Sequence, residues 1–368
     1  MISANNGQWI KNKFYLYLVF IVLIVLSYTW SYAYLRYEKY TPAKFNLLIG
    51  KEIAGRFSAQ IDSSIPVTLS YGYDSQFFWT LSVDPSLTNP YLLSIPERHA
   101  YRMQRILLPL LTRMIIQKNE NLMYGLWFWE LVGYLMIIIG ITRICRRWTI
   151  RPYVPVILVL ANPGLFISAI HPMSDTLAVG FIILALSFFI KNQYWASAIF
   201  FSLSLLTRET SLIIILLLGL FTVLYQTDQL KKIILPFSLA CLPWILWQIS
   251  IYRHFGHLPL GGPDQFNIIP MKGTFDTLSG NSGDSYSHKI SVLIPFICLT
   301  SVLLLFSQRK QIIPFLIIGL SMITLFYGKP ILEDIKGSMR TSSLLFVLNS
   351  IWIFIYPSLQ YLPEKVQT

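Results

Sequence analysis

An acidic residue followed by several arginines is the feature of this apolar chain that most clearly indicates chemistry. Asp74 lies in the stretch YDSQF at 73–77, and Arg98, Arg102 and Arg105 follow it. A carboxylate can accept a proton from an attacking hydroxyl, and the planar fork of arginine binds phosphate oxygens in pairs. The combination predicts chemistry on a phosphate-bearing substrate, with Asp74 as the base.

Aromatic residues flank Asp74 on both sides. Such residues favour the headgroup level of a membrane, so the carboxylate is expected at the membrane surface. A second interpretation is that Asp74 caps a helix that begins near Ser75.

The three arginines recur at intervals of four and three residues, which places them on one face of a helix. The opposite face is apolar, so we expect a helix that lies in the membrane interface and turns its arginines toward a polar cavity. For Arg98, contact with lipid headgroups is an equally good interpretation. Arg102 and Arg105 are expected to bind the substrate.

Composition places the chain in a membrane. It has 368 residues, of which 54% are hydrophobic and 12% charged, whereas a soluble domain has about 25% charged residues. Apolar runs of about 20 residues, the length that crosses a bilayer, recur along the chain. We expect spans near 14–35, 122–142, 153–170, 175–190, 194–207, 209–225, 233–251, 290–306, 311–327 and 341–359. The predicted fold class is an all-α integral membrane protein with about ten transmembrane helices, forming one polytopic domain over 1–368.

Lysine and arginine in the short loops predict the orientation of these spans. Basic residues gather in alternate loops, so both termini are expected in the cytoplasm and the segments 36–121, 252–289 and 328–340 outside. The segment 36–121 is expected to be partly helical and to carry the active site. The net charge of +12 follows partly from this bias, and no nucleic-acid-binding motif accompanies it. The first span is expected to be an uncleaved anchor because its apolar stretch exceeds a signal-peptide core.

Further charged residues reach the same outer face from distant parts of the sequence. They are Asp175, Arg208, Glu209, Asp334 and Arg340. Charged groups at membrane depth are costly, and they are usually functional or paired. Structural interpretations stand beside the functional one: Arg208 with Glu209 and Asp334 with Arg340 as ion pairs, and Asp175 as a helix N-cap.

The sequence gives little support for a cofactor. His254 and His257 could share a helical face, but two ligands do not make a zinc site, and no Gly-rich phosphate loop is present. We expect no cofactor, with a divalent metal ion as the disfavoured alternative. The three cysteines lie in or next to expected spans, so a structural disulfide is not expected.

The chain resembles bacterial polytopic proteins that are assigned to cell-surface glycopolymer formation and look like GT-C glycosyltransferases. The resemblance rests first on YDSQFF at 73–78, DP at 84–85 and YRMQRILLP at 101–109. The usual forms in that family read YDGQFYY, DP and YRYQRILYP.

Later segments extend the resemblance through most of the chain. They are NPG at 162–164, LTRE at 206–209, and the acidic pair at 333–334 followed by Arg340. One departure is Ser75, which stands where glycine is usual. If that position needs a positive backbone angle, Ser75 would be strained there.

The resemblance implies a glycosyltransferase in the bacterial cytoplasmic membrane with its active site facing outward. It would transfer a sugar from a polyprenyl-phosphate donor to a cell-envelope glycan or lipid acceptor, and no nucleic acid would take part. Asp74 would be the single general base, which is consistent with inversion at the anomeric carbon. The donor phosphate would be held by Arg102, Arg105, Arg208 and Arg340. Further substrate contacts would be made by Tyr73, Gln76, Tyr101, Asp175, Glu209 and Asp334.

Three other functions remain open from the sequence. A lipid-linked glycan flippase would need the same spans and basic cavity, but transporters often show repeated halves and helices broken at the midplane. A glycan polymerase or ligase would use similar arginines on the same face. A purely structural scaffold would leave the acidic and basic residues unexplained.

Overall fold

The computed structural model describes residues 49–56, 67–68, 74–88, 99–148, 150–259, 266–279, 286–332 and 335–359 of the chain. The first expected span, 14–35, lies outside the described residues, as do Tyr73, Arg98 and Asp334. Within the described part, helices dominate, and two short parallel strands pair Ile49 with Val67 and Gly50 with Thr68.

Ten helices of the described part form a bundle, and the other elements lie around it. The bundle helices are α8 (Leu122–Arg147), α9 (Tyr153–Leu160), α10 (Pro163–Ile170), α11 (Asp175–Phe189), α12 (Tyr194–Thr207), α13 (Ser211–Tyr225), α14 (Leu230–Phe255), α16 (Tyr286–Leu305), α17 (Ile312–Thr324) and α20 (Ser343–Leu359). The smaller elements are β1 (Ile49–Gly50), α3 (Lys51–Arg56), β2 (Val67–Thr68), α4 (Ser75–Val83), α6 (His99–Arg102), α7 (Leu107–Ile115), α15 (Lys272–Ser279), α18 (Lys329–Leu332) and α19 (Ile335–Thr341). Short 3-10 turns lie at Asn119–Asn121, Thr227–Gln229 and Phe306–Gln308.

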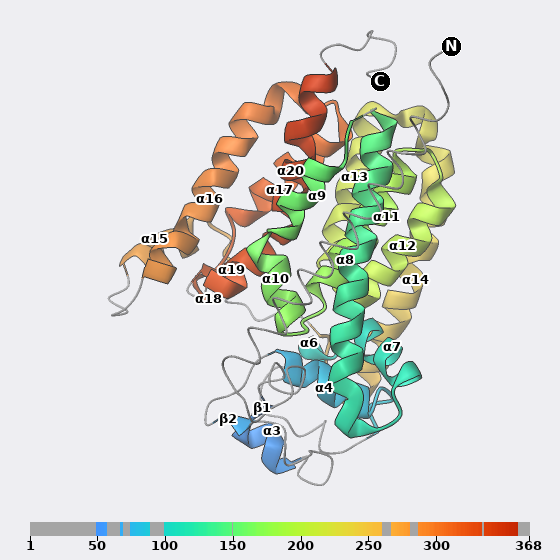
Figure 1. Ribbon diagram of the computed structural model, residues 1–368, viewed down its shortest axis with the longest axis vertical. Coiled ribbons are helices and arrows are strands. Elements are labelled where there is room, and N and C mark those ends of the chain that lie inside the picture. The colour runs from blue at the N-terminus through green and yellow to red at the C-terminus, as the bar shows by residue number, and fades with distance from the viewer. Residues whose placement is uncertain are drawn as a thin grey trace.

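The arrangement places most of the N-terminal elements at one end of the bundle. Figure 1 shows α8, α11, α12 and α14 running lengthwise, with α3, α4, α6 and α7 gathered at their lower end. Helix α11 packs against α8 on one side and α12 on the other, and α12 packs against α14. Helix α17 contacts α13, α16 and α20, so it packs the C-terminal helices of the bundle together.

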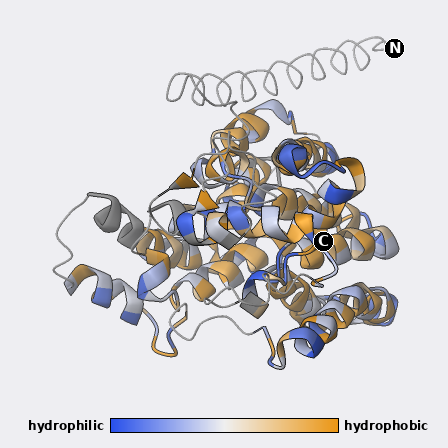
Figure 2. Ribbon diagram, turned by 90° about the horizontal axis from the view of Figure 1, so that it is seen from below, coloured by the Kyte–Doolittle hydropathy of each residue, from blue (hydrophilic) through white to orange (hydrophobic). Residues whose placement is uncertain are grey.

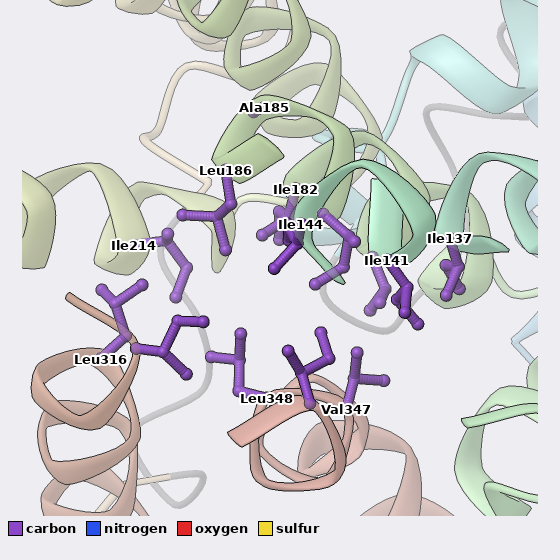
Figure 3. Packing of buried hydrophobic residues seen from close by; sticks show 14 of the residues in the cluster. Ile137, Ile141, Ile144, Ile182, Ala185, Leu186, Ile214, Leu316, Val347 and Leu348 are labelled. Atoms are coloured by element: carbon purple, nitrogen blue, oxygen red, sulfur yellow. The ribbon is translucent and has the colours of Figure 1, made fainter. Parts of the chain in front are cut away.

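A continuous apolar core joins α8 and α11 to the C-terminal helices α17 and α20. Figure 3 shows isoleucines of α8 and α11 facing leucine and valine side chains of α17 and α20, with Ile214 of α13 beside them. The bundle is also apolar on its outside, where Ile199, Leu216 and Leu235 are each more than half exposed. In Figure 2, orange marks hydrophobic residues, and it appears along most of the helices. A bundle that is apolar on both its inner and outer faces is typical of a membrane protein.

The helix lengths only partly match the expected spans. The extended helices Asn119–Arg147 and Thr227–Phe255 are long and apolar enough to cross a membrane. Helices α11, α12, α13 and α17 are apolar but shorter. The described residues therefore support a helical membrane protein without confirming the number of about ten spans.

The expected single span at 153–170 is broken. Helices α9 and α10 meet at an angle of 57°. Pro163 cannot donate a backbone hydrogen bond, so it starts a new helix rather than continuing the old one. The side chain of Asn162 caps that helix by accepting from the backbone nitrogens of Gly164 and Leu165.

Glycine residues allow α8 and α11 to approach closely. A Cβ atom at Gly133 would lie 2.6 Å from the backbone nitrogen of Leu177, and one at Gly180 would lie 2.6 Å from the carbonyl oxygen of Gly133. Backbone atoms cannot move aside as the end of a flexible side chain can. The close contact therefore requires glycine, which has no side chain, at both Gly133 and Gly180.

We predict that Gly133→Ala destabilises the protein by about 1–3 kcal/mol, because the added methyl group overpacks the contact between α8 and α11. Gly219→Ala in α13 is the matched control, since its Cβ would meet nothing within 4 Å. Alanine also favours a helix over glycine, so the control is expected to be neutral or slightly stabilising. Thermal unfolding of both variants in detergent tests this, and equal melting temperatures would contradict it.

Candidate active site

Four arginines and three carboxylates from distant segments meet in one group. The members of this charged cluster are Asp74, Arg102, Arg105, Asp175, Arg208, Glu209 and Arg340, and each takes part in at least one ion pair with another member. Four guanidinium groups against three carboxylates leave one net positive charge. The sequence-based expectation that these residues converge therefore agrees with the geometry, although their roles remain predictions.

Asp74 lies immediately before α4 but does not cap it. Its side chain makes no capping hydrogen bond and instead accepts from Arg102 at one oxygen and from Arg340 Nη2 at the other, the latter at 3.0 Å. Burial alone would raise the pKa of Asp74, but the charges of Arg340 and Arg102 outweigh it and hold that pKa well below its usual range. The carboxylate is therefore ionised and doubly paired.

The start of α4 is unstrained and tied to the strands. Ser75 is the first residue of a right-handed helix and is not among the described residues with positive φ. Its replacement of the usual glycine therefore costs no backbone strain. Gln76 is buried, and its side-chain oxygen accepts from the backbone nitrogen of Gly50 at 2.9 Å. Gln76 thus anchors the segment that carries Asp74, and its expected contact with substrate stays a prediction.

The expected continuous helix through the arginines is wrong. Helix α6 ends at Arg102 and α7 begins at Leu107. Pro109 explains the break, because a proline ring in a continuous helix would clash with the carbonyl of Arg105, four residues earlier. The carbonyl freed at Met103 accepts from the indole nitrogen of Trp247 at 2.9 Å.

Because of this break, Arg102 and Arg105 have different partners. Arg102 pairs with Asp74, and its guanidinium lies 4.2 Å from the ring centre of Phe77. Arg105 makes a bidentate pair with Glu209, with Nε at 3.0 Å and Nη2 at 2.8 Å from its two oxygens. Arg105 Nη2 also donates to the hydroxyl of Tyr101 at 3.0 Å.

The expected pair between Arg208 and Glu209 does not form. Arg208 pairs with Asp175, which also lies 3.3 Å from Arg340 Nε. The backbone of Arg208 is extended, with φ −155° and ψ 121°, and successive side chains of an extended chain point to opposite sides. Adjacent residues therefore reach different partners. Arg340 pairs with Asp74 and Asp175, while its expected partner Asp334 lies outside the described residues.

A cavity of about 620 Å³ opens beside the charged cluster. Its lining includes Tyr101, Asp175, Arg208, Glu209 and Arg340. Its walls are mainly apolar and come from α11, α13, α14, α17 and α20: Val179, Ile182, Ile214, Trp244, Leu320, Ile323 and Leu345. Such a cavity suits a ligand with an anionic group at one end and an apolar chain at the other.

The described residues hold no group of three or more His, Cys, Asp or Glu side chains that could bind a metal ion. The carboxylates of the charged cluster are paired with arginines. Independence from metal ions stays a prediction.

One buried carboxylate near the charged cluster escaped the sequence analysis. Glu130 of α8 is fully buried, and it accepts hydrogen bonds at 2.8 Å from the Ser168 hydroxyl and at 3.2 Å from the backbone nitrogen of Thr176, next to Asp175. An acidic residue within an expected span, 122–142, was the signal that could have identified it.

The pKa of Glu209 gives a prediction about stability and pH. Glu209 lies in the turn between α12 and α13, and although burial opposes ionisation, Arg105 lowers its pKa from 4.5 to about 2. A lowered folded-state pKa stabilises the protein above pH 4.5, and this stabilisation is lost as the pH falls toward 2. We therefore predict that the difference in melting temperature between wild type and Glu209→Gln is constant from about pH 8 to 6 and narrows below about pH 4.5.

Glu120→Gln, at an exposed residue of the turn before α8, is the control and should follow the wild-type curve. Thermal unfolding in detergent across this pH range measures all three proteins. A wild-type advantage that stays the same down to pH 3 would show that the ion pair with Arg105 does not lower the pKa of Glu209.

Comparison with known families gives one match. Residues 109–224, about a third of the chain, match the family described as alpha-(1->6)-mannopyranosyltransferase, N-terminal domain. No curated protein and no solved structure matches the chain. The matched segment runs from α7 to α13 and includes Asp175, Arg208 and Glu209 but not Asp74 or Arg340. With the apolar helices, it supports the expectation from the sequence: the protein is a membrane glycosyltransferase, similar to mannosyltransferases of the GT-C type.

Proposed function

We propose that the protein transfers a sugar from a polyprenyl-phosphate donor to a glycan or lipid acceptor of the cell envelope, with Asp74 as general base. The observation that carries this proposal is a largely apolar cavity whose lining includes four members of the charged cluster, Asp175, Arg208, Glu209 and Arg340, of which Arg340 also pairs with Asp74. In the proposed setting the chain spans the bacterial cytoplasmic membrane about ten times, with both termini in the cytoplasm. The charged cluster then faces outward.

The charge balance of the cluster suits a phosphate leaving group. In the reaction, the acceptor oxygen bonds to the anomeric carbon, the bond from that carbon to the phosphate oxygen breaks, and the phosphate keeps the electron pair. The phosphate thereby gains a second negative charge. Arginines fixed around it stabilise that charge as it develops, which lowers the barrier. Arg208 and Arg340 line the cavity and are the best placed of the four for this role.

In this proposal, the ion pairs of Asp74 control when it acts as a base. While Arg102 and Arg340 hold its carboxylate, its lowered pKa makes it a weak proton acceptor. A donor phosphate competes for the same guanidinium groups. Once Arg340 turns to the phosphate, the pKa of Asp74 rises, and the carboxylate can take the proton of the acceptor hydroxyl.

The remainder of the cavity suits the lipid part of the donor. Apolar side chains such as Val179, Ile182 and Leu345 line the same cavity as Arg208 and Arg340. An isoprenoid chain buries its surface there without leaving polar groups unpaired. The name of the matched family makes a mannosyl donor the first candidate.

We predict that Asp74→Asn lowers turnover by about 10²–10⁴-fold, the usual contribution of a general base, while donor binding is retained. Transfer from a panel of radiolabelled polyprenyl-phosphate sugars, mannose included, measures this with purified wild type and variant. Glu120→Gln is the control and should keep wild-type turnover.

Wild-type turnover in Asp74→Asn would refute the base assignment. Tight donor binding without transfer by either protein would favour a flippase. Transfer of a preformed glycan instead of one sugar would identify a polymerase or ligase.

We further predict that Arg340→Lys weakens donor binding about tenfold, because lysine keeps the charge but loses the fork that reaches two anions. Arg309→Lys, at a partly exposed arginine outside the charged cluster, in the turn that follows α16, is the matched control. Equilibrium binding of labelled polyprenyl phosphate measures the donor, and the Michaelis constant for acceptor serves as comparison. Equal weakening of donor and acceptor would contradict a phosphate role for Arg340.

A further inference from the structure

Glu130 lies outside the charged cluster, yet it contacts the segment that carries Asp175. It is within α8, and its side chain is fully buried. A buried carboxylate is costly unless hydrogen bonds compensate it. Its partners are therefore informative about its role.

The hydrogen bonds of Glu130 connect it to the start of α11, directly and through Ser168. Its Oε2 accepts from the Ser168 hydroxyl at 2.8 Å and from the backbone nitrogen of Thr176 at 3.2 Å. The oxygen of Ser168 in turn accepts from the backbone nitrogen of Asp175 at 3.1 Å. Glu130 and Ser168 together thus hold the first two backbone N–H groups of α11.

These two N–H groups have no cap from the preceding residue. Ser174 stands at the N-cap position, but its side chain makes no capping hydrogen bond, and its backbone is left-handed with φ 68°. A helix start leaves its first N–H groups without partners, and a non-glycine residue adopts the left-handed conformation only when its surroundings impose it. By contrast, Asn162 caps α10 with its own side chain. Glu130, on another helix, therefore provides the capping acceptor oxygen that the side chain of Ser174 does not provide.

The close packing of α8 and α11 makes this contact rigid. Gly133, one turn beyond Glu130, lies so close to the backbone of Thr176 and Leu177 that no side chain would fit between them. The start of α11 is thereby held at two points by α8. Asp175, its first residue, pairs with both Arg208 and Arg340.

We propose that Glu130 is a positioning residue that orients Asp175, and through it Arg208 and Arg340, for the donor phosphate. This inference rests on the proposed function, because it assigns those arginines to the donor. Glu130 touches no substrate in this role. Its contribution is an acceptor oxygen that fixes where the Asp175 carboxylate stands.

The test compares two substitutions that separate the acceptor oxygen from the charge. Glu130→Gln keeps an oxygen that can accept from both Ser168 and Thr176, so turnover should stay within about threefold of wild type. Glu130→Leu has a similar size but removes the acceptor oxygen. The Ser168 hydroxyl then loses its acceptor, and the Thr176 N–H keeps only its longer bond to the Ser168 oxygen at 3.3 Å. Turnover should therefore fall about tenfold or more. Thr142→Val, at a buried α8 residue whose hydroxyl bonds only to its own helix at Ile138, is the control for changes within α8.

A double-mutant cycle with Asp175→Asn shows whether Glu130 acts through Asp175. If it does, the variant carrying both Glu130→Leu and Asp175→Asn should turn over donor no more slowly than Asp175→Asn alone. The proposal would be overturned if the fold-loss of turnover in the double variant equalled the product of the losses in the two single variants. It would also be overturned if Thr142→Val lost as much activity as Glu130→Leu, or if Glu130→Gln failed to retain activity while remaining folded.

A second measurement needs no substrate. Amide hydrogen exchange over residues 171–178, followed by mass spectrometry, should be faster in Glu130→Leu than in wild type and unchanged in Glu130→Gln. Unchanged exchange in Glu130→Leu would overturn the positioning role. Absence of sugar transfer by wild type together with faster exchange in Glu130→Leu would instead overturn the proposed function and leave Glu130 as the residue that fixes Asp175.

Discussion

The site depends on Arg340, which bridges Asp74 and Asp175. The two carboxylates come from the start of α4 and the start of α11, and Arg340 comes from α19 near the end of the chain. The side chain of Arg340 is only 12% exposed. Its guanidinium cannot remain unpaired there, because removing a charge from water costs several kcal/mol unless opposite charges compensate it. The pairing therefore requires three separate segments to converge. The packing of the bundle serves to bring them there.

That packing is controlled by a few backbone features rather than by the apolar core in general. Gly133 and Gly180 let α8 and α11 touch backbone to backbone, and Pro163 bends the chain between α9 and α10. Gly164, in the bent segment, lies against the carbonyl of Met339, the residue before Arg340. The same contacts that make the bundle compact thus set the position of both Asp175 and Arg340. Apolar residues of the core could be exchanged for others of similar volume with less effect on the site.

The sequence predicted that charged residues from distant segments gather, and seven of them do so in the described part of the chain, while Arg98 and Asp334 lie outside it. The sequence did not predict how these seven residues pair. Charges in an apolar chain stand out, and the basic residues of alternate loops predict that these charges share one side of the membrane, so their convergence could be expected. Pairing depends on local backbone direction, such as the extended conformation that separates Arg208 from Glu209. Pro109 was visible in the sequence and should have argued against a continuous helix through Arg105. Glu130 was visible too, but its hydrogen bonds to α10 and α11 follow from tertiary packing alone.

The ion pairs also bear on the order of events in the proposed reaction. A carboxylate held by two arginines is a poor base, so an acceptor hydroxyl that arrives first finds Asp74 unable to take its proton. A donor phosphate that arrives first draws Arg340 away and leaves Asp74 paired with Arg102 alone. Under the proposed function, the base is therefore activated by the substrate whose bond it helps to break. The arrangement costs little, because each arginine exchanges one anion for another and is never left unpaired. Under this proposal, the same seven charges account for both the stability of the ion-pair network and its response to the donor.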